Sequence, residues 1–290
     1  MQSGSNLQRL AAVLVAAGLA AAGALAADVE RTGGPYVPTP QVVVDEMLRM
    51  AKVGPADVVV DLGSGDGIIV LTAAQKHKAR GFGVDIDPDL VKLSNDEAKR
   101  LGIADRAQFH VQDVFKADIG KATVVTLYLL PGMMVNLRPK IFNELKPGAR
   151  VVSHDYHFAD DWLPDDQFTF DVPEKEKVNG VGNDTVYLWI VPAKVGGRWR
   201  IRVATPSVGQ YDVTLRQNYK NIDGSVGPDG GKGERLTMAQ LRGEDIAFAF
   251  PAAGGRHVFT GRVAGNVMQG NVELAGGKGT AKWSAMRLIN

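Results

Sequence analysis

The most informative chemistry in the sequence lies in a glycine-rich segment, VVVDLGSGDG, from Val58 to Gly67. Gly63, Gly65 and Gly67 follow an apolar stretch, and glycines at a strand-to-helix turn let the backbone approach a ligand closely. A dinucleotide fold needs Gly or Ala at the next position, which holds Ile68, and a P-loop needs a Lys that this segment lacks. The spacing therefore favours a nucleotide-like ligand without a pyrophosphate.

Two carboxylates accompany these glycines. Asp61 ends the apolar stretch, and Asp66 lies inside the loop, shortly after Ser64. Both would repel a phosphate, whereas positive groups on a ligand would be attracted. S-adenosylmethionine (SAM) carries a sulfonium and an ammonium group. We therefore predict a SAM site whose loop residues are Asp61, Gly63, Ser64, Gly65 and Gly67.

Further aspartates follow the next two predicted strands. Asp85 is placed to accept hydrogen bonds from the ribose hydroxyls, and Asp113 from the adenine amino group. Ile86 and Val114 are expected to sandwich the adenine ring. Asp87 is an alternative to Asp85, and any single aspartate here has an ordinary reading as a turn or cap residue. The aspartates together favour a ligand at the carboxyl edge of the sheet.

The methyl acceptor is expected after the fourth predicted strand, around Tyr128 and Leu129. Enzymes that methylate adenine or amide nitrogens carry an Asn/Asp-Pro-Pro-Tyr/Phe pattern there, and this chain does not. That absence argues against DNA adenine and glutamine as acceptors and leaves lysine or small amines.

The segment SHDYH, from Ser153 to His157, supplies the best candidates for a proton acceptor. His154 or Asp155 can take a proton from an ammonium group, so both join Tyr128 as predicted catalytic residues. The alternative is that these histidines are ordinary strand and loop residues. A metal site of His154, Asp155 and His157 matches no usual ligand spacing, so no metal is predicted.

Strands and helices alternate in the first two thirds of the chain, which predicts a parallel sheet with helices on both faces. The fold class is thus α/β and Rossmann-like. Two further strands, over 168–172 and 185–191, lack a helix between them and are expected to pair as a hairpin. The preceding strands are expected at 57–62, 83–86, 107–111, 122–129 and 150–154, and the helices near 40–51, 68–79, 88–101 and 135–145. Thr39 is expected to cap the first of these helices.

The pattern changes after Pro192 to short alternating runs separated by Gly, Asn and Asp. Such runs predict a small antiparallel all-β domain, either a barrel or a sandwich. We expect a methyltransferase domain over 35–193 and a β-rich accessory domain over 197–290, in which we find no catalytic constellation. Its strands are expected at 199–203, 211–217, 246–250, 257–263, 267–274 and 280–288, with a loop over 224–233.

Composition and the N-terminus bear on location. The chain has 290 residues, no Cys and a formal net charge of +1, which excludes thiol chemistry and does not favour a nucleic-acid partner. Arg9 precedes an uncharged apolar run that ends in Ala24-Leu25-Ala26. These are the parts of a secretory signal peptide over 1–27, which would place the protein in the periplasm or outside the cell. The alternative is an uncleaved membrane anchor.

Several strings resemble those of the lysine N-methyltransferases that act on the ATP synthase c-subunit and the adenine nucleotide translocase, and of their bacterial relatives. The strings are PYVPTP, VVVDLGSGDG, GVDIDPDLV and the stretch from Leu129 to Ile141, and the resemblance covers about half of the chain. It implies a seven-stranded class I methyltransferase fold, SAM as cofactor and a lysine of a membrane-associated protein as acceptor. It also implies that Tyr36 and Thr39 lie near the methionine end of the cofactor, with Asp61, Gly63, Gly65 and Asp85 in the same site.

The sequence departs from this family in three ways. Ile68 replaces the usual Arg after the last loop glycine, and an apparent signal peptide replaces the membrane-inserting segment. The β domain from about Gly197 has no counterpart in the mitochondrial enzymes. Two other functions therefore stay open, an exported SAM-fold binding protein without turnover and a methyltransferase for small amines or hydroxyls.

Overall fold

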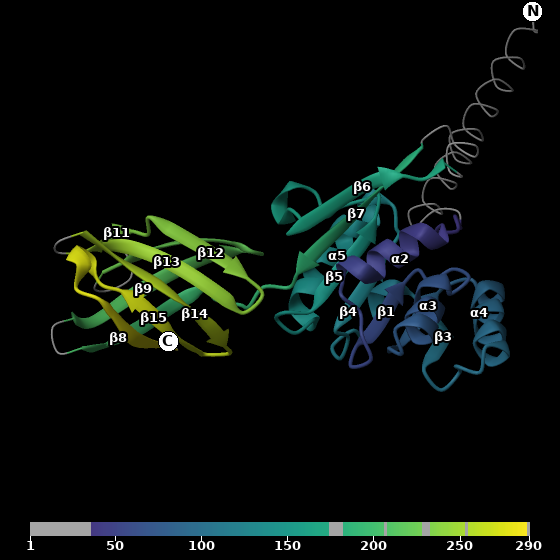
Figure 1. Cartoon of the computed structure of the whole chain (residues 1–290), viewed down its shortest axis with the longest axis horizontal. Coiled ribbons are helices and arrows are strands. Elements are labelled where there is room, and N and C mark those ends of the chain that lie inside the picture. The colour runs from purple at the N-terminus through teal and green to yellow at the C-terminus, as the bar shows by residue number, and fades with distance from the viewer. Residues whose placement is uncertain (1–35, 174–181, 206–207, 228–232, 253–254, 289–290) are drawn as a thin grey trace, which may run out of the picture.

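The computed structural model describes residues 36–173, 182–205, 208–227, 233–252 and 255–288 (Figure 1). Its first part is a seven-stranded sheet of order β3-β2-β1-β4-β5-β7-β6. The first five strands are parallel, and β7 runs antiparallel between β5 and β6. The strands are β1 Val58–Leu62, β2 Arg80–Asp85, β3 Ala107–Val111, β4 Val124–Leu127, β5 Arg150–His154, β6 Asp166–Asp171 and β7 Asn183–Ile190.

Helices cover both faces of this sheet, as predicted. One apolar cluster joins α2 Gln41–Met50 and α3 Ile68–Lys76 to one face, and a second joins α5 Pro131–Glu144 to the other. The fourth helix, α4 Pro88–Arg100, packs beside α3 and over β3. The architecture is therefore the Rossmann-like α/β fold expected from the sequence, and the predicted hairpin is formed by β6 and β7.

Two local expectations need correction. Thr39 does not cap α2, because the helix begins at Gln41 with Pro40 as its N-cap and has no side-chain cap. The helix after β4 begins at Pro131, four residues before the expected start. Pro at the first helical position has the right φ and needs no hydrogen-bond donor, so Pro131-Gly132 opens a helix and does not form a turn.

The second part is one antiparallel sheet of nine strands that curls around its own apolar core (Figure 1). The expected barrel or sandwich is thus a single curled sheet. Three strands were not expected, namely β10, β11 and β12, and β10 extends into the start of the predicted loop. The strands are β8 Gly197–Thr205, β9 Val208–Asn218, β10 Asn221–Val226, β11 Glu234–Arg235, β12 Met238–Arg242, β13 Asp245–Ala252, β14 Gly255–Ala264, β15 Val267–Glu273 and β16 Thr280–Arg287.

The two sheets meet at the turn between β9 and β10. The ring of Tyr219 stacks on Trp162, with centroids 4.8 Å apart and an interplanar angle of 8°. Lys220 Nζ donates to the carbonyl of Pro164 at 2.8 Å, and the N–H of Ala193 donates to the carbonyl of Gly243 at 2.7 Å. Tyr219 also contacts the core beneath α5, so the β9–β10 turn is packed into the first sheet's apolar layer.

The predicted signal peptide or anchor over 1–27 lies outside the described residues. Within the described ranges, every helix is too short or too polar to cross a lipid bilayer.

Candidate active site

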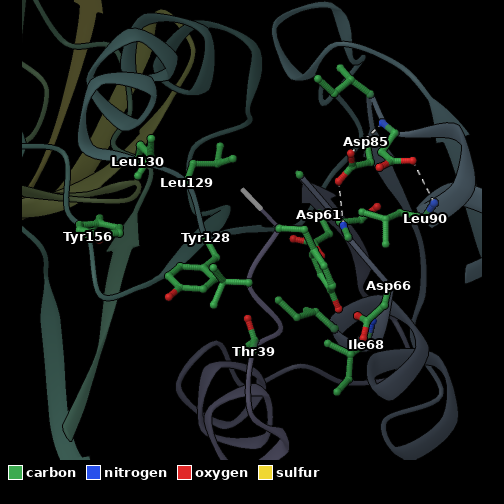
Figure 2. A pocket seen from close by; sticks show the side chains of 18 of the residues that line it. Thr39, Asp61, Asp66, Ile68, Asp85, Leu90, Tyr128, Leu129, Leu130 and Tyr156 are labelled. Carbon is green, nitrogen blue, oxygen red and sulfur yellow. Dashed lines mark hydrogen bonds between the residues drawn. The ribbon is translucent and has the colours of Figure 1, made fainter. Parts of the chain in front are cut away.

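A cavity of about 530 Å³ opens at the carboxyl ends of β1, β2 and β4 (Figure 2). This is the edge at which the sequence predicts a ligand, and the volume is within the range of small-molecule sites. Its lining consists of Tyr36, Val37, Thr39, Asp61, Gly63, Ser64, Gly65, Asp66, Ile68, Ile69, Asp85, Ile86, Asp87, Pro88, Leu90, Tyr128, Leu129, Leu130 and Tyr156.

The glycine loop lines the cavity, and its glycines have no room for a side chain. Gly63 and Gly65 have φ of +87° and +51°, a region that other residues rarely adopt. A Cβ atom on Gly63 would lie 2.8 Å from Leu129 Cδ2, and one on Gly65 would lie 2.6 Å from Tyr36 Cε2. The N–H groups of Gly63 and Ser64 both donate to the carbonyl of Val84, which fixes the loop to β2.

Asp85 joins the loop to the end of β2. Its carboxylate accepts a hydrogen bond from the N–H of Gly65 at 2.9 Å and another from the N–H of Asp87 at 3.0 Å. An ionised carboxylate has about four lone-pair positions. Acceptor capacity therefore remains for two hydroxyl groups of a ligand in the cavity.

Asp61 is a buried carboxyl at the base of the cavity. Only 2% of its surface is exposed, and Thr126 Oγ1 donates to it at 2.7 Å. Burial raises the pKa of Asp61 to about 7, against the lowering effect of the Thr126 hydrogen bond and with help from the negative charges of Asp85 and Asp66. This carboxyl is thus poised to ionise when a positive group is placed beside it.

Tyr36 closes the cavity over the glycine loop. Its ring lies on Gly65, and its hydroxyl forms a hydrogen bond with Asp66. Partial burial, the Asp66 hydrogen bond and the charges of Asp66 and Asp85 raise the pKa of Tyr36, so its phenol stays protonated. Asp66 also accepts from the N–H of Ile68 at 3.2 Å, which fixes this carboxylate at the start of α3.

The far wall of the cavity is aromatic. Tyr128 and Tyr156 both line it, with ring centroids 6.4 Å apart and an interplanar angle of 18° (Figure 2). Tyr156 was not among the predicted site residues, although it lies within the SHDYH segment singled out in the sequence. The signal that would have found it is its position two residues beyond the end of β5, on the same sheet edge.

A buried histidine lies behind this wall. The ring of His154 lies 4.0 Å from that of Tyr128, centroid to centroid. His154 Nε2 is 3.3 Å from Asp184 Oδ2 and 3.5 Å from Asp155 Oδ2. Asp184 was not predicted, because it belongs to β7 and approaches His154 only through the pairing of distant strands. His157, considered beside them as a metal ligand, instead accepts from the N–H of Ala159 at 3.1 Å.

The structure brings together most of the predicted site residues in one cavity. The predicted residues that line it are Tyr36, Thr39, Asp61, Gly63, Ser64, Gly65, Asp85, Ile86, Tyr128 and Leu129. Five predicted residues do not line it, namely Gly67, Asp113, Val114, His154 and Asp155. Asp113 caps the 3₁₀ helix Val114–Lys116 by accepting from the N–H of Phe115, and Val114 is buried in the core.

The chemistry of this cavity fits SAM. Four carboxyl groups line it, those of Asp61, Asp66, Asp85 and Asp87, and within the described part of the chain none of them forms an ion pair with Lys, Arg or His. A cationic ligand would neutralise them, whereas a phosphate would be repelled. Asp85 offers acceptors for a ribose.

Comparisons with known proteins agree with this assignment. A family model described as the ANTKMT methyltransferase domain matches residues 61–166. A protein-lysine N-methyltransferase from Saccharolobus islandicus is 39% identical over 158 residues, which are 54% of this chain and 93% of that protein. The ATP synthase c-subunit lysine N-methyltransferase of Xenopus laevis is 34% identical over 155 residues, and the chain spans 62% of its length.

A solved structure is also similar. It is an RNA methyltransferase from Salinibacter ruber in complex with S-adenosyl-L-homocysteine, 50% identical, with a TM-score of 0.49. The match covers 55% of this chain and 96% of that one. Most of the Saccharolobus islandicus enzyme is covered at 39% identity, and the family model spans the glycine loop and the aromatic wall of the cavity. The chain therefore belongs to the protein-lysine N-methyltransferase family, and it is a methyltransferase that uses SAM.

Proposed function

We propose that the chain transfers a methyl group from SAM to the side-chain amine of a lysine in a protein substrate, and that this substrate is membrane-associated. The observation that carries the proposal is one continuous cavity with two unlike walls. Carboxyl groups lie on one wall, suited to the cofactor, and Tyr128 and Tyr156 lie on the other. The names of the relatives support lysine as acceptor and, for the Xenopus enzyme, a component of ATP synthase as substrate.

Each part of the cavity has a proposed role toward the cofactor. Bound SAM supplies an electrophilic methyl group on its sulfonium sulfur. Asp61 and Asp66 hold the positive end of the cofactor, and Asp85 holds the ribose. Tyr36 and Thr39 enclose the methionine end, and Tyr36 excludes water from above the glycine loop. Ile86 contacts the adenine, for which Asp113 and Val114 remain predicted partners.

The acceptor wall has the chemistry for an alkylamine. Aromatic rings bind an ammonium group through their π faces and also accept the methylated amine, whose charge is retained. Transfer needs the neutral amine in line with the methyl and sulfur atoms, and orientation contributes much of the rate. His154 and Asp155 remain predicted proton acceptors. Since neither lines the cavity, we propose that a proton reaches them only past Tyr128 or Tyr156.

The proposed location is outside the cytoplasm or at the membrane, from the predicted signal peptide or anchor over 1–27. The β domain is proposed as an accessory unit that docks the substrate or the membrane. Residues 197–290 contain 13 Lys and Arg but only seven Asp and Glu. This excess of basic residues favours a negatively charged substrate or membrane surface as the partner.

Transfer of labelled methyl groups tests the proposal. The mature protein is incubated with methyl-labelled SAM and a membrane extract, and the labelled product is hydrolysed to amino acids. The proposal predicts label in methyllysine, and much less label with Asp85→Asn at the same SAM concentration. Label in small molecules would support the small-amine alternative. Binding of SAM without any labelled product would support the exported binding protein.

A further inference from the structure

A buried cluster of His154, Asp155 and Asp184 lies directly behind the acceptor wall. His154 and Asp184 are each 1% exposed, and Nε2 of the imidazole lies within 3.5 Å of a carboxylate oxygen of both aspartates. Burial of such groups is costly unless they pair with one another. A cluster of this kind in a methyltransferase fold needs a reason beyond packing, because apolar side chains would fill the same space at lower cost.

The backbone around the cluster is also held in an unusual shape. Asp155 has a φ of +59°, in the left-handed region that residues other than Gly rarely adopt. Two hydrogen bonds with Thr185 fix it there, since the N–H of Asp155 donates to the Thr185 carbonyl and the Thr185 N–H donates to Asp155 Oδ1. This turn places His154 behind the wall and Tyr156 in it. Strain that surrounding contacts hold in place is typical of functional sites.

The cluster reaches the cavity through one ring. Tyr128 lies between His154 and the cavity, and its ring faces that of His154 at a centroid distance of 4.0 Å with an interplanar angle of 32°. The three residues lie at the same edge of the sheet. Tyr128 follows β4, His154 ends the neighbouring β5, and Asp184 lies on β7, the next strand. The two rings are therefore close enough for the plane of the His154 ring to restrict that of Tyr128.

We propose that Asp184 is a positioning residue for methyl transfer, acting through His154 to hold the ring of Tyr128 at the angle that orients the acceptor amine. The inference rests on the proposed function, since only that function gives Tyr128 a substrate to orient. Asp155 supports His154 from the second side, and its strained turn also fixes Tyr156.

The variants that test this are Asp184→Asn, His154→Ala and His154→Phe, with Thr185→Val as control. Thr185 is the next residue of β7, but its hydroxyl faces away and pairs with that of Thr169 at 2.8 Å.

Asp184→Asn is expected to lower kcat/KM for the lysine substrate about ten- to hundredfold, the scale of a misplaced reactive group. The Kd for SAM is expected to stay within about twofold, because no SAM-facing residue changes. His154→Phe keeps a ring behind Tyr128 but loses the contact with Asp184, so its rate is expected to fall to about the same extent as that of Asp184→Asn.

A readout that does not depend on activity separates this inference from the proposed function. The protein is labelled with fluorotyrosine, and the ¹⁹F resonance of Tyr128 is assigned by its loss in Tyr128→Phe. The inference predicts that Asp184→Asn shifts or broadens this resonance and that Thr185→Val does not.

An unchanged Tyr128 resonance in Asp184→Asn would overturn the inference, as would equal losses of SAM affinity and of methyl-transfer rate in this variant. Loss of wild-type activity on chelation, restored by Zn²⁺, would also overturn it in favour of a metal at the cluster. A wild type that transfers nothing to lysine, yet shows the resonance change, would contradict the proposed function alone.

Discussion

The ring of Tyr36 lies so close to Gly65 that a Cβ atom on this glycine would come within 2.6 Å of Tyr36 Cε2. Two segments that are far apart in the sequence thus share one small volume above the loop. The contact explains why this turn carries a glycine and why an aromatic residue precedes α2. It also makes the cover of the cofactor cavity sensitive to a single methyl group.

Gly65→Ala is therefore expected to weaken SAM binding strongly. The added Cβ displaces Tyr36, and the φ of +51° becomes strained, at a cost of about 1–3 kcal/mol. Calorimetric titration with SAM is expected to show a Kd raised by about tenfold or more. Gly54→Ala is the control, because a Cβ there meets nothing within 4 Å and should leave the Kd unchanged. Wild-type affinity in Gly65→Ala would show that Tyr36 does not cover the cofactor.

Asp61 is expected to make stability depend on pH. Its pKa of about 7 in the folded protein exceeds the ordinary value of about 3.9, so the neutral acid is favoured by folding. The neutral acid stabilises the folded protein fully below about pH 4. This stabilisation, on the order of a few kcal/mol, is lost as the pH rises through 7. Urea unfolding without SAM should show that Asp61→Asn gains stability relative to wild type between pH 5 and pH 8. If the free energy of unfolding changed with pH in the same way in both proteins, the raised pKa and buried position of this carboxyl would be contradicted.

Much of this site was accessible from the sequence because its signals are local. The glycine loop, Asp61 and Asp85 follow short apolar runs whose ends meet at one edge of a parallel sheet. Asp184 was missed because its approach to His154 depends on β7 pairing beside β5. Tyr156 had a local signal, its position two residues beyond the end of β5, which was not used. Pattern alone predicted that β6 and β7 pair, but it did not indicate their order in the sheet.

Other residues have two physically reasonable uses. Thr39 has the chemistry of a helix cap, yet it lines the cavity and Pro40 precedes the helix. Asp113 has the chemistry of an adenine acceptor and, in this structure, caps a 3₁₀ helix. In the second sheet, β11 has only two residues and β10 contains Gly224, so neither carries the alternation that identifies a strand.

Tyr156 is expected to recognise the acceptor through its ring and not through its hydroxyl. Tyr156→Leu removes the π face, which is worth about 0.5–2 kcal/mol toward a cation, and kcat/KM for the lysine substrate should fall accordingly. Tyr156→Phe keeps the ring and should retain most of the rate. Initial rates at saturating SAM measure both. An equal loss in the two variants would assign the role to the hydroxyl.

Tyr219 is expected to hold the two sheets together. Its ring stacks on Trp162 and meets Phe142 edge-on at 5.2 Å. Tyr219→Ala should lower the free energy of unfolding by about 2–4 kcal/mol, while Tyr219→Phe should cost little. Urea denaturation followed by tryptophan fluorescence measures this, since Trp162 lies at the contact. Equal stability of Tyr219→Ala and wild type would show that the contact contributes nothing.

Titration of the protein with SAM in a calorimeter tests the central claim most directly, for wild type, Asp85→Ala and Asp89→Ala. Asp89 carries the same charge in the first turn of α4 but does not line the cavity. We predict one SAM site in wild type and in Asp89→Ala, and a Kd raised at least about tenfold in Asp85→Ala, the loss of a charge-assisted hydrogen bond. No binding by wild type, or binding that Asp85→Ala leaves unchanged, would contradict the assignment of this cavity to SAM.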